Sequence, residues 1–134
     1  MILMKKNLGI VAVALLFFLG ISALFGSYQL ITDPTGKSLQ MPLGLLKPTP
    51  FENYLIPGIL LFLTNGIPAI LIGFISIKKI DHYEYFIILQ GGILFLWLTA
   101  ELIINIDFYY PVTHVSYYII AILLMGIGFK LRKS

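Results

Sequence analysis

The chain has 134 residues, of which 59% are hydrophobic and 11% are charged, and its mean hydropathy is +0.97. About a quarter of the residues of a soluble domain carry charge, so this composition excludes an ordinary water-soluble protein. The net charge of +3 does not indicate nucleic acid, because the basic residues flank apolar segments and form no patch. The lack of cysteine excludes thiol–disulfide chemistry and cysteine-based metal sites.

Four apolar segments are expected to cross a membrane, at residues 8–25, 58–77, 85–106 and 114–129. The hydrocarbon core of a bilayer is ~30 Å thick and needs ~20 helical residues, a length that these segments exceed or approach. The remaining residues are too few for a separate soluble domain. We therefore expect an all-α fold, a membrane-embedded four-helix bundle in which residues 1–134 form one domain.

The first segment follows Lys5 and Lys6, as the apolar part of a signal peptide does. Its apolar run of about 18 residues exceeds the usual 7–15, and no A-x-A cleavage motif follows. We expect this segment to be retained as a spanning helix.

The connection at residues 26–57 carries turn and cap signals, which predict an ordered outer loop. D-P-T-G at 33–36 is a β-turn sequence, and the preceding residues 28–32 are interpreted as extended backbone. T-P-F-E at 49–52 matches a capping box with proline at the first helical position, which predicts a short helix from Pro50. The apolar residues between these motifs indicate a segment that lies on the membrane surface or caps the bundle. They are Leu39, Met41, Leu43, Leu45 and Leu46.

The second segment is interrupted by Asn65-Gly66-Ile67-Pro68. Pro68 cannot donate to the Thr64 carbonyl, so a kink is predicted there. We favour a structural kink whose freed backbone groups find neighbouring partners. The alternative is a discontinuous helix whose free carbonyls line a binding site.

Small and polar residues at helical spacing predict the faces that meet inside the bundle. In the second segment these are Gly58, Asn65, Ala69 and Ser76. In the third segment, Gln90, Trp97, Glu101 and Asn105 fall within an arc of roughly 80°, so this polar face should point toward the other helices. Gly91-Gly92 is interpreted as a point of close packing.

The Lys and Arg side chains predict the orientation, because basic residues accumulate on the cytoplasmic side of spanning helices. Seven of the nine lie before the first segment, between the second and third, or after the fourth. Only Lys37 and Lys47 lie in the other connections. We expect both termini in the cytoplasm and the 26–57 loop outside, with tyrosines anchoring the helix ends at the interface.

Four motifs of the outer loop, D-P-T-G (33–36), P-L-G-L-L (42–46), T-P-F (49–51) and Y-L-I-P-G (54–58), precede the segment L-W-L-T-A-E-L-I (96–103). With these motifs, most of the chain resembles a group of small uncharacterised bacterial four-span membrane proteins. The resemblance implies a bacterial inner-membrane protein of this topology and brings no activity with it. The layout of the spans also resembles that of DoxX-like proteins, in hydropathy alone.

Glu101 is the one fully ionisable side chain expected within a spanning segment, and such residues are functional by default because their charge is costly in hydrocarbon. Glu101 and Asn65 lie ~8 Å and ~10 Å from the outer ends of their segments, so they share a layer. We expect Glu101 to be protonated or hydrogen-bonded to Asn65. The candidate ligand-binding residues are Glu101, Asn65, Trp97, Asn105, His114 and Gln90.

The leading hypothesis is a non-enzymatic membrane protein that binds a partner or a small or lipophilic ligand in an outward-facing pocket around Glu101. Glu101 can instead be structural, holding helices together by a hydrogen bond. A second functional hypothesis is a small oligomeric transporter or proton-coupled carrier, and a third is a lipid-modifying membrane enzyme. Catalysis is the least supported, since no second carboxylate is expected at that depth and no known catalytic motif occurs.

We expect no cofactor, no metal site and no nucleic acid. The expected partners are the lipid bilayer, a small or lipophilic ligand, and a second copy of the chain or another membrane protein.

Overall fold

The structure, a computed structural model, describes residues 2–133, which form helices and turns and contain no strand. Four helices are long and apolar enough to cross a membrane. They are α1 (Ile2–Thr32), the helix made of α2 (Leu55–Leu61), the π-helical turn η3 (Phe62–Gly66) and α3 (Ile67–Ile77), then α4 (Tyr83–Ile104) and α5 (Pro111–Lys133). Short 3-10 helices in the connections are η1 (Lys37–Leu39), η2 (Leu43–Leu46) and η4 (Ile106–Phe108). The all-α four-helix bundle is confirmed, and the chain is a multi-pass membrane protein.

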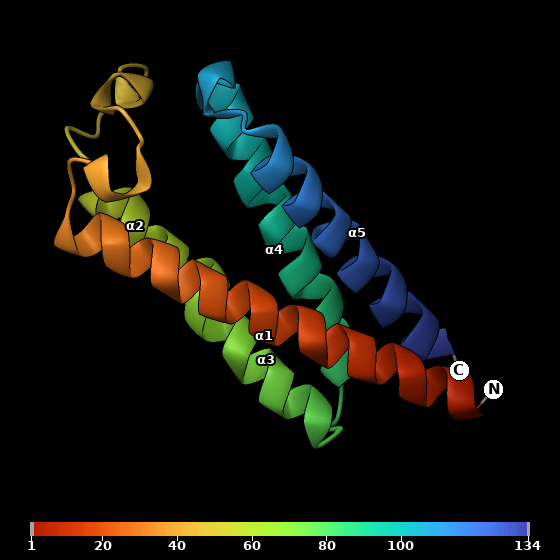
Figure 1. Cartoon of the computed structure of the whole chain (residues 1–134). Coiled ribbons are helices and arrows are strands. Elements are labelled where there is room, and N and C mark those ends of the chain that lie inside the picture. Colours follow the sequence, from red (N-terminus) through yellow and green to blue (C-terminus); the bar gives the residue numbers. More distant parts are fainter. Residues whose placement is uncertain (1, 134) are drawn as a thin grey trace.

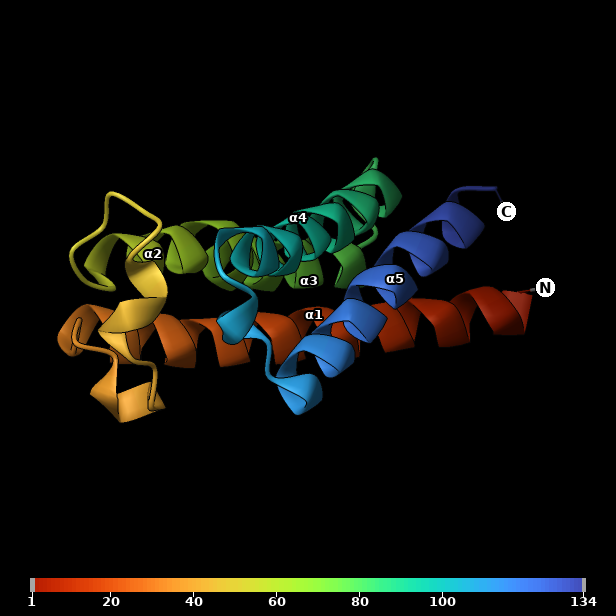
Figure 2. The same cartoon turned by 90° about the horizontal axis from the view of Figure 1, so that it is seen from above.

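The helices form two antiparallel pairs (Figure 1). α1 packs along α2, η3 and α3, while α4 packs along α5. The pairs touch through α1 with α5 and through α3 with α4. They lie close together near the termini and separate toward residues 33–54. Figure 2 shows both termini at one end, which we call the terminal end. The opposite end, which carries residues 33–54, is the loop end.

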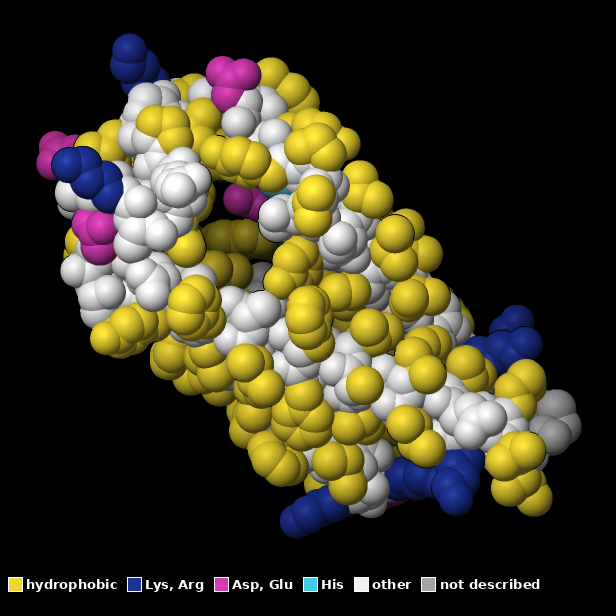
Figure 3. Space-filling model, viewed as in Figure 1, with side chains coloured by type: hydrophobic (Ala, Val, Ile, Leu, Met, Phe, Trp, Pro, Cys, Tyr) yellow, Lys and Arg dark blue, Asp and Glu magenta, His cyan; other side chains and the backbone are white. Residues whose placement is uncertain are grey.

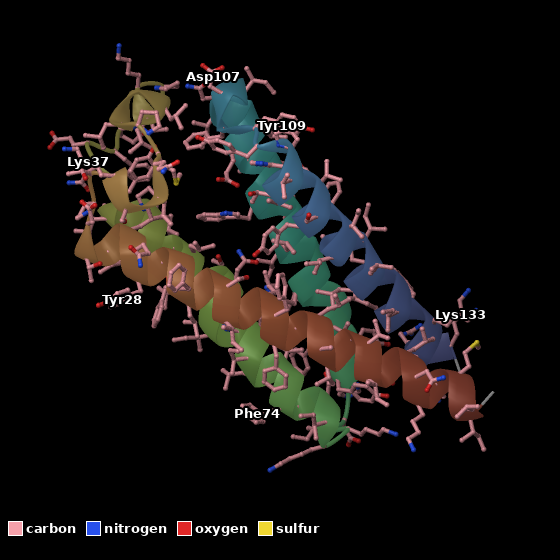
Figure 4. All side chains as sticks on the ribbon, viewed as in Figure 1. Tyr28, Lys37, Phe74, Asp107, Tyr109 and Lys133 are labelled. Carbon is pink, nitrogen blue, oxygen red and sulfur yellow. The ribbon has the colours of Figure 1, made fainter. Side chains whose placement is uncertain are left out.

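Large apolar side chains cover the outside of the bundle, as a membrane environment requires. Those more than half exposed include Phe18, Ile21, Leu71, Phe74 and Leu96. Basic side chains gather at the terminal end, as the dark blue groups of Figure 3 show. Figure 4 marks Lys133 at this end, and Lys37 with Asp107 at the other.

The inner faces follow the predicted helical spacing. Gly58, Asn65, Ala69 and Ser76 of the second span are all buried. Gly91 confirms the predicted point of close packing, because a Cβ atom there would lie 2.8 Å from the Ala121 carbonyl oxygen of α5. Its neighbour Gly92 has nothing within 4 Å of such an atom. Only one glycine of the pair is therefore needed for helix contact.

Gly91→Ala is expected to destabilise the α4–α5 pair by about 1–3 kcal/mol, since the methyl group would press on backbone atoms that have no rotamer to change. Gly92→Ala is the matched control. It is expected to leave stability unchanged or raise it by up to about 1 kcal/mol, the difference in helix propensity. Thermal unfolding of both variants in one detergent measures the difference. Equal unfolding temperatures would contradict the close contact.

α1 is longer at both ends than the predicted span of residues 8–25, and the extended backbone predicted for residues 28–32 is wrong. The Asp33 amide donates to the Gln29 carbonyl at 2.9 Å, so helical bonding continues to the end of α1. Leu30 explains the extension, because it is buried against Gly58 and the loop residues. The other spans also differ by a few residues from their predicted ends, with α4 stopping at Ile104.

The helix predicted from Pro50 does not form, and α2 begins at Leu55. The Thr49 hydroxyl accepts from the Phe51 amide at 3.1 Å, two residues on, where a capping box would require the amide of Glu52. The side chain that meets the start of α2 is Asn53, whose Oδ1 accepts from the Leu55 amide at 3.0 Å. Thr49 therefore closes a turn and does not cap a helix.

The interruption at Pro68 takes the form of the π-helical turn η3, directly before α3. Proline removes one helical donor, and a π turn is a usual way to absorb that loss within a membrane helix. The Thr64 carbonyl, four residues before Pro68, accepts a hydrogen bond from Gln90 Nε2 of α4 at 3.1 Å. The freed carbonyl is thus satisfied by a neighbouring helix, in agreement with the structural interpretation.

The connection between α1 and α2 is ordered around Tyr54. The predicted turn is present, since the Gly36 amide donates to the Asp33 carbonyl at 3.1 Å. The Thr35 hydroxyl donates to the Asp33 carboxylate at 2.6 Å, which lowers the pKa of Asp33 below its ordinary value. The Tyr54 hydroxyl donates to the Pro42 carbonyl at 2.7 Å. The loop thereby closes on itself above the bundle.

Candidate functional site

Glu101 lies where the two helix pairs separate. It is three residues before the end of α4, ~4.5 Å along the helix axis. Its side chain is 25% exposed and borders three cavities, of about 860, 310 and 180 Å³. The largest is lined by α1 and α5, the second by α2 and α4, and the third extends inward to Asn65. We call them the α1–α5 cavity, the α2–α4 cavity and the deep cavity.

His114, in the first turn of α5, lies beside Glu101 in the wall of the α1–α5 cavity. The Tyr110 amide donates to His114 Nδ1 at 3.1 Å, so Nδ1 is the acceptor and Nε2 carries the proton of the neutral ring. Nε2 points toward Glu101 Oε1 at 3.6 Å, too far for a direct hydrogen bond. The ring is only 2% exposed, and Nε2 has no hydrogen-bond partner among the described residues.

An unsatisfied buried donor costs about 1–3 kcal/mol, so its presence calls for an explanation. Here the donor and a carboxylate converge on one cavity. The 3.6 Å separation leaves no room for another atom between the two groups, so a polar group that bonds to both must approach the pair from the side of the cavity. Figure 3 shows this cavity as a hollow with an acidic side chain and a histidine at its inner wall.

The lower boundary of the α1–α5 cavity is closed by contacts between α1 and α5. The Tyr117 hydroxyl donates to Ser22 Oγ at 2.7 Å, and Ser22 donates in turn to the Leu19 carbonyl at 3.0 Å. The Tyr117 ring stacks on Phe18 with ring centroids 6.1 Å apart. These contacts join the two pairs below Glu101, and the helices separate only above them.

The roof of the site is formed by the loop between α1 and α2 and by η4. Leu39, Met41 and Phe108 border both the α1–α5 and the α2–α4 cavity. Tyr54 supports this roof from within the loop, and burial raises the pKa of its phenol to about 12. Its hydroxyl therefore keeps its proton, and with it the bond to Pro42, at physiological pH.

Beneath the site lies a polar layer that joins α4 to the π turn. Gln90 Nε2 donates to Asn65 Oδ1 at 3.1 Å as well as to the Thr64 carbonyl, and both Gln90 and Asn65 are fully buried. Asn65 Nδ2 donates to the Thr64 hydroxyl at 3.1 Å. The hydrogen bond expected between Asn65 and Glu101 is absent from the described residues, where Asn65 Oδ1 accepts from Gln90 and Asn65 Nδ2 donates to Thr64.

The structure separates the predicted site residues into three groups. Glu101, Trp97 and His114 border the cavities, and Asn65 reaches the deep cavity. Gln90 lies in the polar layer below. Asn105 lies beyond the end of α4, where its Oδ1 accepts from the Asp107 amide at 3.0 Å, so it shapes η4 and borders none of the three cavities.

Sequence reasoning missed several cavity residues. Ser22 has no signal of its own in an apolar helix. The sequence places Tyr117 among the interfacial tyrosines and on the packing face of the fourth segment with Ala121, Leu124 and Gly128, but does not indicate that it borders a cavity. Phe108 is not indicated at all, whereas Met41 belongs to the apolar loop segment that is expected to lie on the membrane surface or cap the bundle. A search for hydroxyl groups one or two turns from the level of Glu101 could have found Ser22 and Tyr117.

The chemistry available here is that of a carboxylate, an imidazole and hydroxyl groups in an otherwise apolar cavity. Such a site can hold the polar head of a lipophilic molecule by hydrogen bonds. Within residues 2–133 no three His, Asp or Glu side chains are grouped as metal ligands would be. No family model matches the chain, and no curated protein or solved structure shows significant similarity to it.

Proposed function

We propose that this membrane protein binds a small lipophilic ligand in the cavities around Glu101, without catalysing a reaction. The observation that carries the proposal is the buried His114 Nε2, which has no hydrogen-bond partner among the described residues and lies 3.6 Å from Glu101 Oε1 in the wall of the α1–α5 cavity. A purely structural role for Glu101 fits less well. No hydrogen bond joins its carboxylate to another helix within residues 2–133, and cavities lie around it.

The position of the cavities favours a binding protein over a carrier. A carrier needs access to its site from both sides of the membrane. Toward the terminal end, the space between the helices is filled by a continuous apolar core that includes Ala12, Leu16, Ile87, Leu124 and Leu131. Among residues 2–133, the cavities that reach Glu101 therefore open in the loop half of the bundle.

Loss of either polar group should remove the ligand. We compare the molecules that co-purify with the unaltered protein and with Glu101→Leu and His114→Asn in detergent-free nanodiscs. The amount of the bound molecule, measured by mass spectrometry, is expected to fall at least tenfold in each variant. One hydrogen bond to a charged group contributes about 1.5–3 kcal/mol, and about 1.4 kcal/mol corresponds to a factor of ten. Amounts are taken relative to bulk phospholipid, so a general loss of lipid does not count.

The matched controls are Glu52→Gln and His82→Asn, which change an exposed carboxylate and an exposed imidazole that line none of the three cavities. Asn suits position 82 because the backbone there has φ 71°. Identical co-purifying molecules in unchanged amounts in all variants would overturn the proposed function.

We further propose a bacterial inner membrane as the location, with both termini in the cytoplasm. The supporting observations are the resemblance of the loop motifs and the seven Lys and Arg residues at the terminal end.

A reporter that is active only in the cytoplasm should give a full signal when fused after Ser134. The same reporter inserted after Lys37 should give none. The reverse pattern, with both fusions stably expressed, would invert the orientation.

A further inference from the structure

The α1–α5 and α2–α4 cavities adjoin each other at Glu101, and we call the two together the passage. Both are bordered by Glu101 from below and by Leu39, Met41 and Phe108 from above. The passage therefore lies under the loop, with Glu101 at the boundary between its two cavities. A ligand longer than the α1–α5 cavity can extend past Glu101 into the α2–α4 cavity.

The α2–α4 cavity offers an apolar surface with few free polar groups. It is lined mainly by aliphatic side chains, among them Leu30, Leu60, Leu61 and Ile104, and by the Trp97 ring. Its two hydroxyl groups are already engaged, since Thr49 donates to the Leu46 carbonyl at 2.8 Å and Tyr54 donates to Pro42. At about 310 Å³ it is near the lower end of ligand pockets, which range from about 300 to 1,000 Å³. This space fits one hydrocarbon chain.

The polar groups at the centre of the passage determine which polar head group a ligand can carry. None of the three cavities is lined by Lys or Arg, so a phosphate or carboxylate head would meet Glu101 with no cation to compensate. An ammonium head could pair with Glu101 but has no lone pair to accept from His114 Nε2. A hydroxyl group does both, because it accepts from Nε2 and donates to the carboxylate.

On this basis, and resting on the proposed binding function, we propose that the ligand is a single-chain lipid with a neutral hydroxyl head. The hydroxyl bonds to Glu101 and His114 from the side of the cavity, and the chain occupies the cavity between α2 and α4. The hydroxyl would satisfy the His114 donor that the described residues leave without a partner. The chain would cover the exposed face of the Trp97 ring.

Trp97 provides the measurement, since it is the only tryptophan of the chain and borders the α2–α4 cavity. The probes are a long-chain primary alcohol with bromine atoms at mid-chain, and the fatty acid and primary amine with the same brominated chain. Bromine quenches tryptophan fluorescence only near contact. In phosphatidylcholine nanodiscs, the alcohol is expected to give saturable quenching that the unbrominated alcohol reverses. The acid and the amine should bind at least tenfold more weakly.

Different substitutions test the binding of the hydroxyl head and the binding of the hydrocarbon chain. Glu101→Leu and His114→Asn should weaken binding of the alcohol at least tenfold. Glu101→Gln, whose amide oxygen can still accept from the hydroxyl, should weaken it less than Glu101→Leu does. Ala100→Phe narrows the α2–α4 cavity and should abolish saturable quenching. Its control, Ala14→Phe, adds the same ring to an exposed position that borders none of the cavities and should change nothing.

Tighter binding of the amine or the acid would overturn the inferred head group while leaving the proposed function intact. Quenching that Ala100→Phe leaves unchanged would overturn the path of the chain. If none of the brominated probes gives saturable quenching, a single-chain lipid is not the ligand. This holds even where the co-purifying molecule is still lost from the Glu101 and His114 variants. Failure of both experiments would overturn the proposed function as well.

Discussion

Replacing Tyr54 by alanine is expected to release the loop over residues 33–54 from the bundle and remove the roof of the candidate site. The ring is 1% exposed and packs with Leu30 and Phe108, and a Cβ atom at Gly36 would lie 2.8 Å from it. Removing a buried aromatic ring of this size lowers the free energy of unfolding by about 3–5 kcal/mol. Trypsin cleavage after Lys37 should therefore accelerate about a hundredfold or more, since each 1.4 kcal/mol is about a factor of ten in the open population.

Tyr28→Ala is the matched control, because this tyrosine is also near the loop end but is 63% exposed. Cleavage after Lys37 should be unchanged there. Tyr54→Phe removes only the hydroxyl that donates to Pro42 and should have a smaller effect, about tenfold or less. Rapid cleavage of the unaltered protein would show that the loop is not ordered in the membrane.

The pH dependence of this protection follows from the Tyr54 phenol. Burial raises its pKa from 10.0 to about 12, so the folded state binds the proton more tightly than the released state. The stabilisation is fully present below pH 10 and is lost as pH rises from 10 through about 12. Protection at Lys37 should therefore be constant across the working range of trypsin, from about pH 7 to 9.

Gln90→Leu is expected to lower the free energy of unfolding by about 1–3 kcal/mol. It removes two interhelical hydrogen bonds, each worth about 0.6 and up to about 1.7 kcal/mol in membrane proteins. It also leaves Asn65 Oδ1 and the Thr64 carbonyl without this donor in a buried layer. Unfolding in mixed detergent micelles, followed by circular dichroism, measures the change.

A second substitution tests whether the hydrogen bond from Gln90 to the Thr64 carbonyl compensates for Pro68. Pro68→Ala restores a backbone amide that can donate to the Thr64 carbonyl, so Gln90 is needed less in that background. The double variant should show a coupling energy of about 1 kcal/mol relative to the sum of the single changes. Strict additivity would mean that Gln90 does not compensate for the proline.

The spans and the inward faces could be predicted from residue type and helical period. Gly58, Asn65, Ala69 and Ser76 recur at a spacing that places them on one face, and all four are buried. The same reasoning places Glu101 on an inward face. These features follow from local chemistry, because lipid accepts apolar side chains and rejects polar ones wherever they occur along a helix.

Pairing between helices could not be predicted, because several polar partners compete at similar depth. Depth alone pairs Asn65 with Glu101, yet Gln90 binds Asn65 and also bonds to the carbonyl freed by Pro68. That choice depends on how α4 sits against the π turn, which no local pattern records. The helix predicted from Pro50 fails for a related reason, since the loop follows the burial of Tyr54 and not the propensity of the cap motif.

The outer openings of the two cavities determine how any ligand would arrive. Exposed apolar side chains border both openings, Phe18 and Phe25 on one side and Leu60 and Ile104 on the other. A molecule using these routes would come from the bilayer by diffusion in two dimensions. Occupancy would then depend on its mole fraction in the membrane, and dissociation constants referred to the aqueous concentration would change with its partition coefficient and with the amount of lipid present.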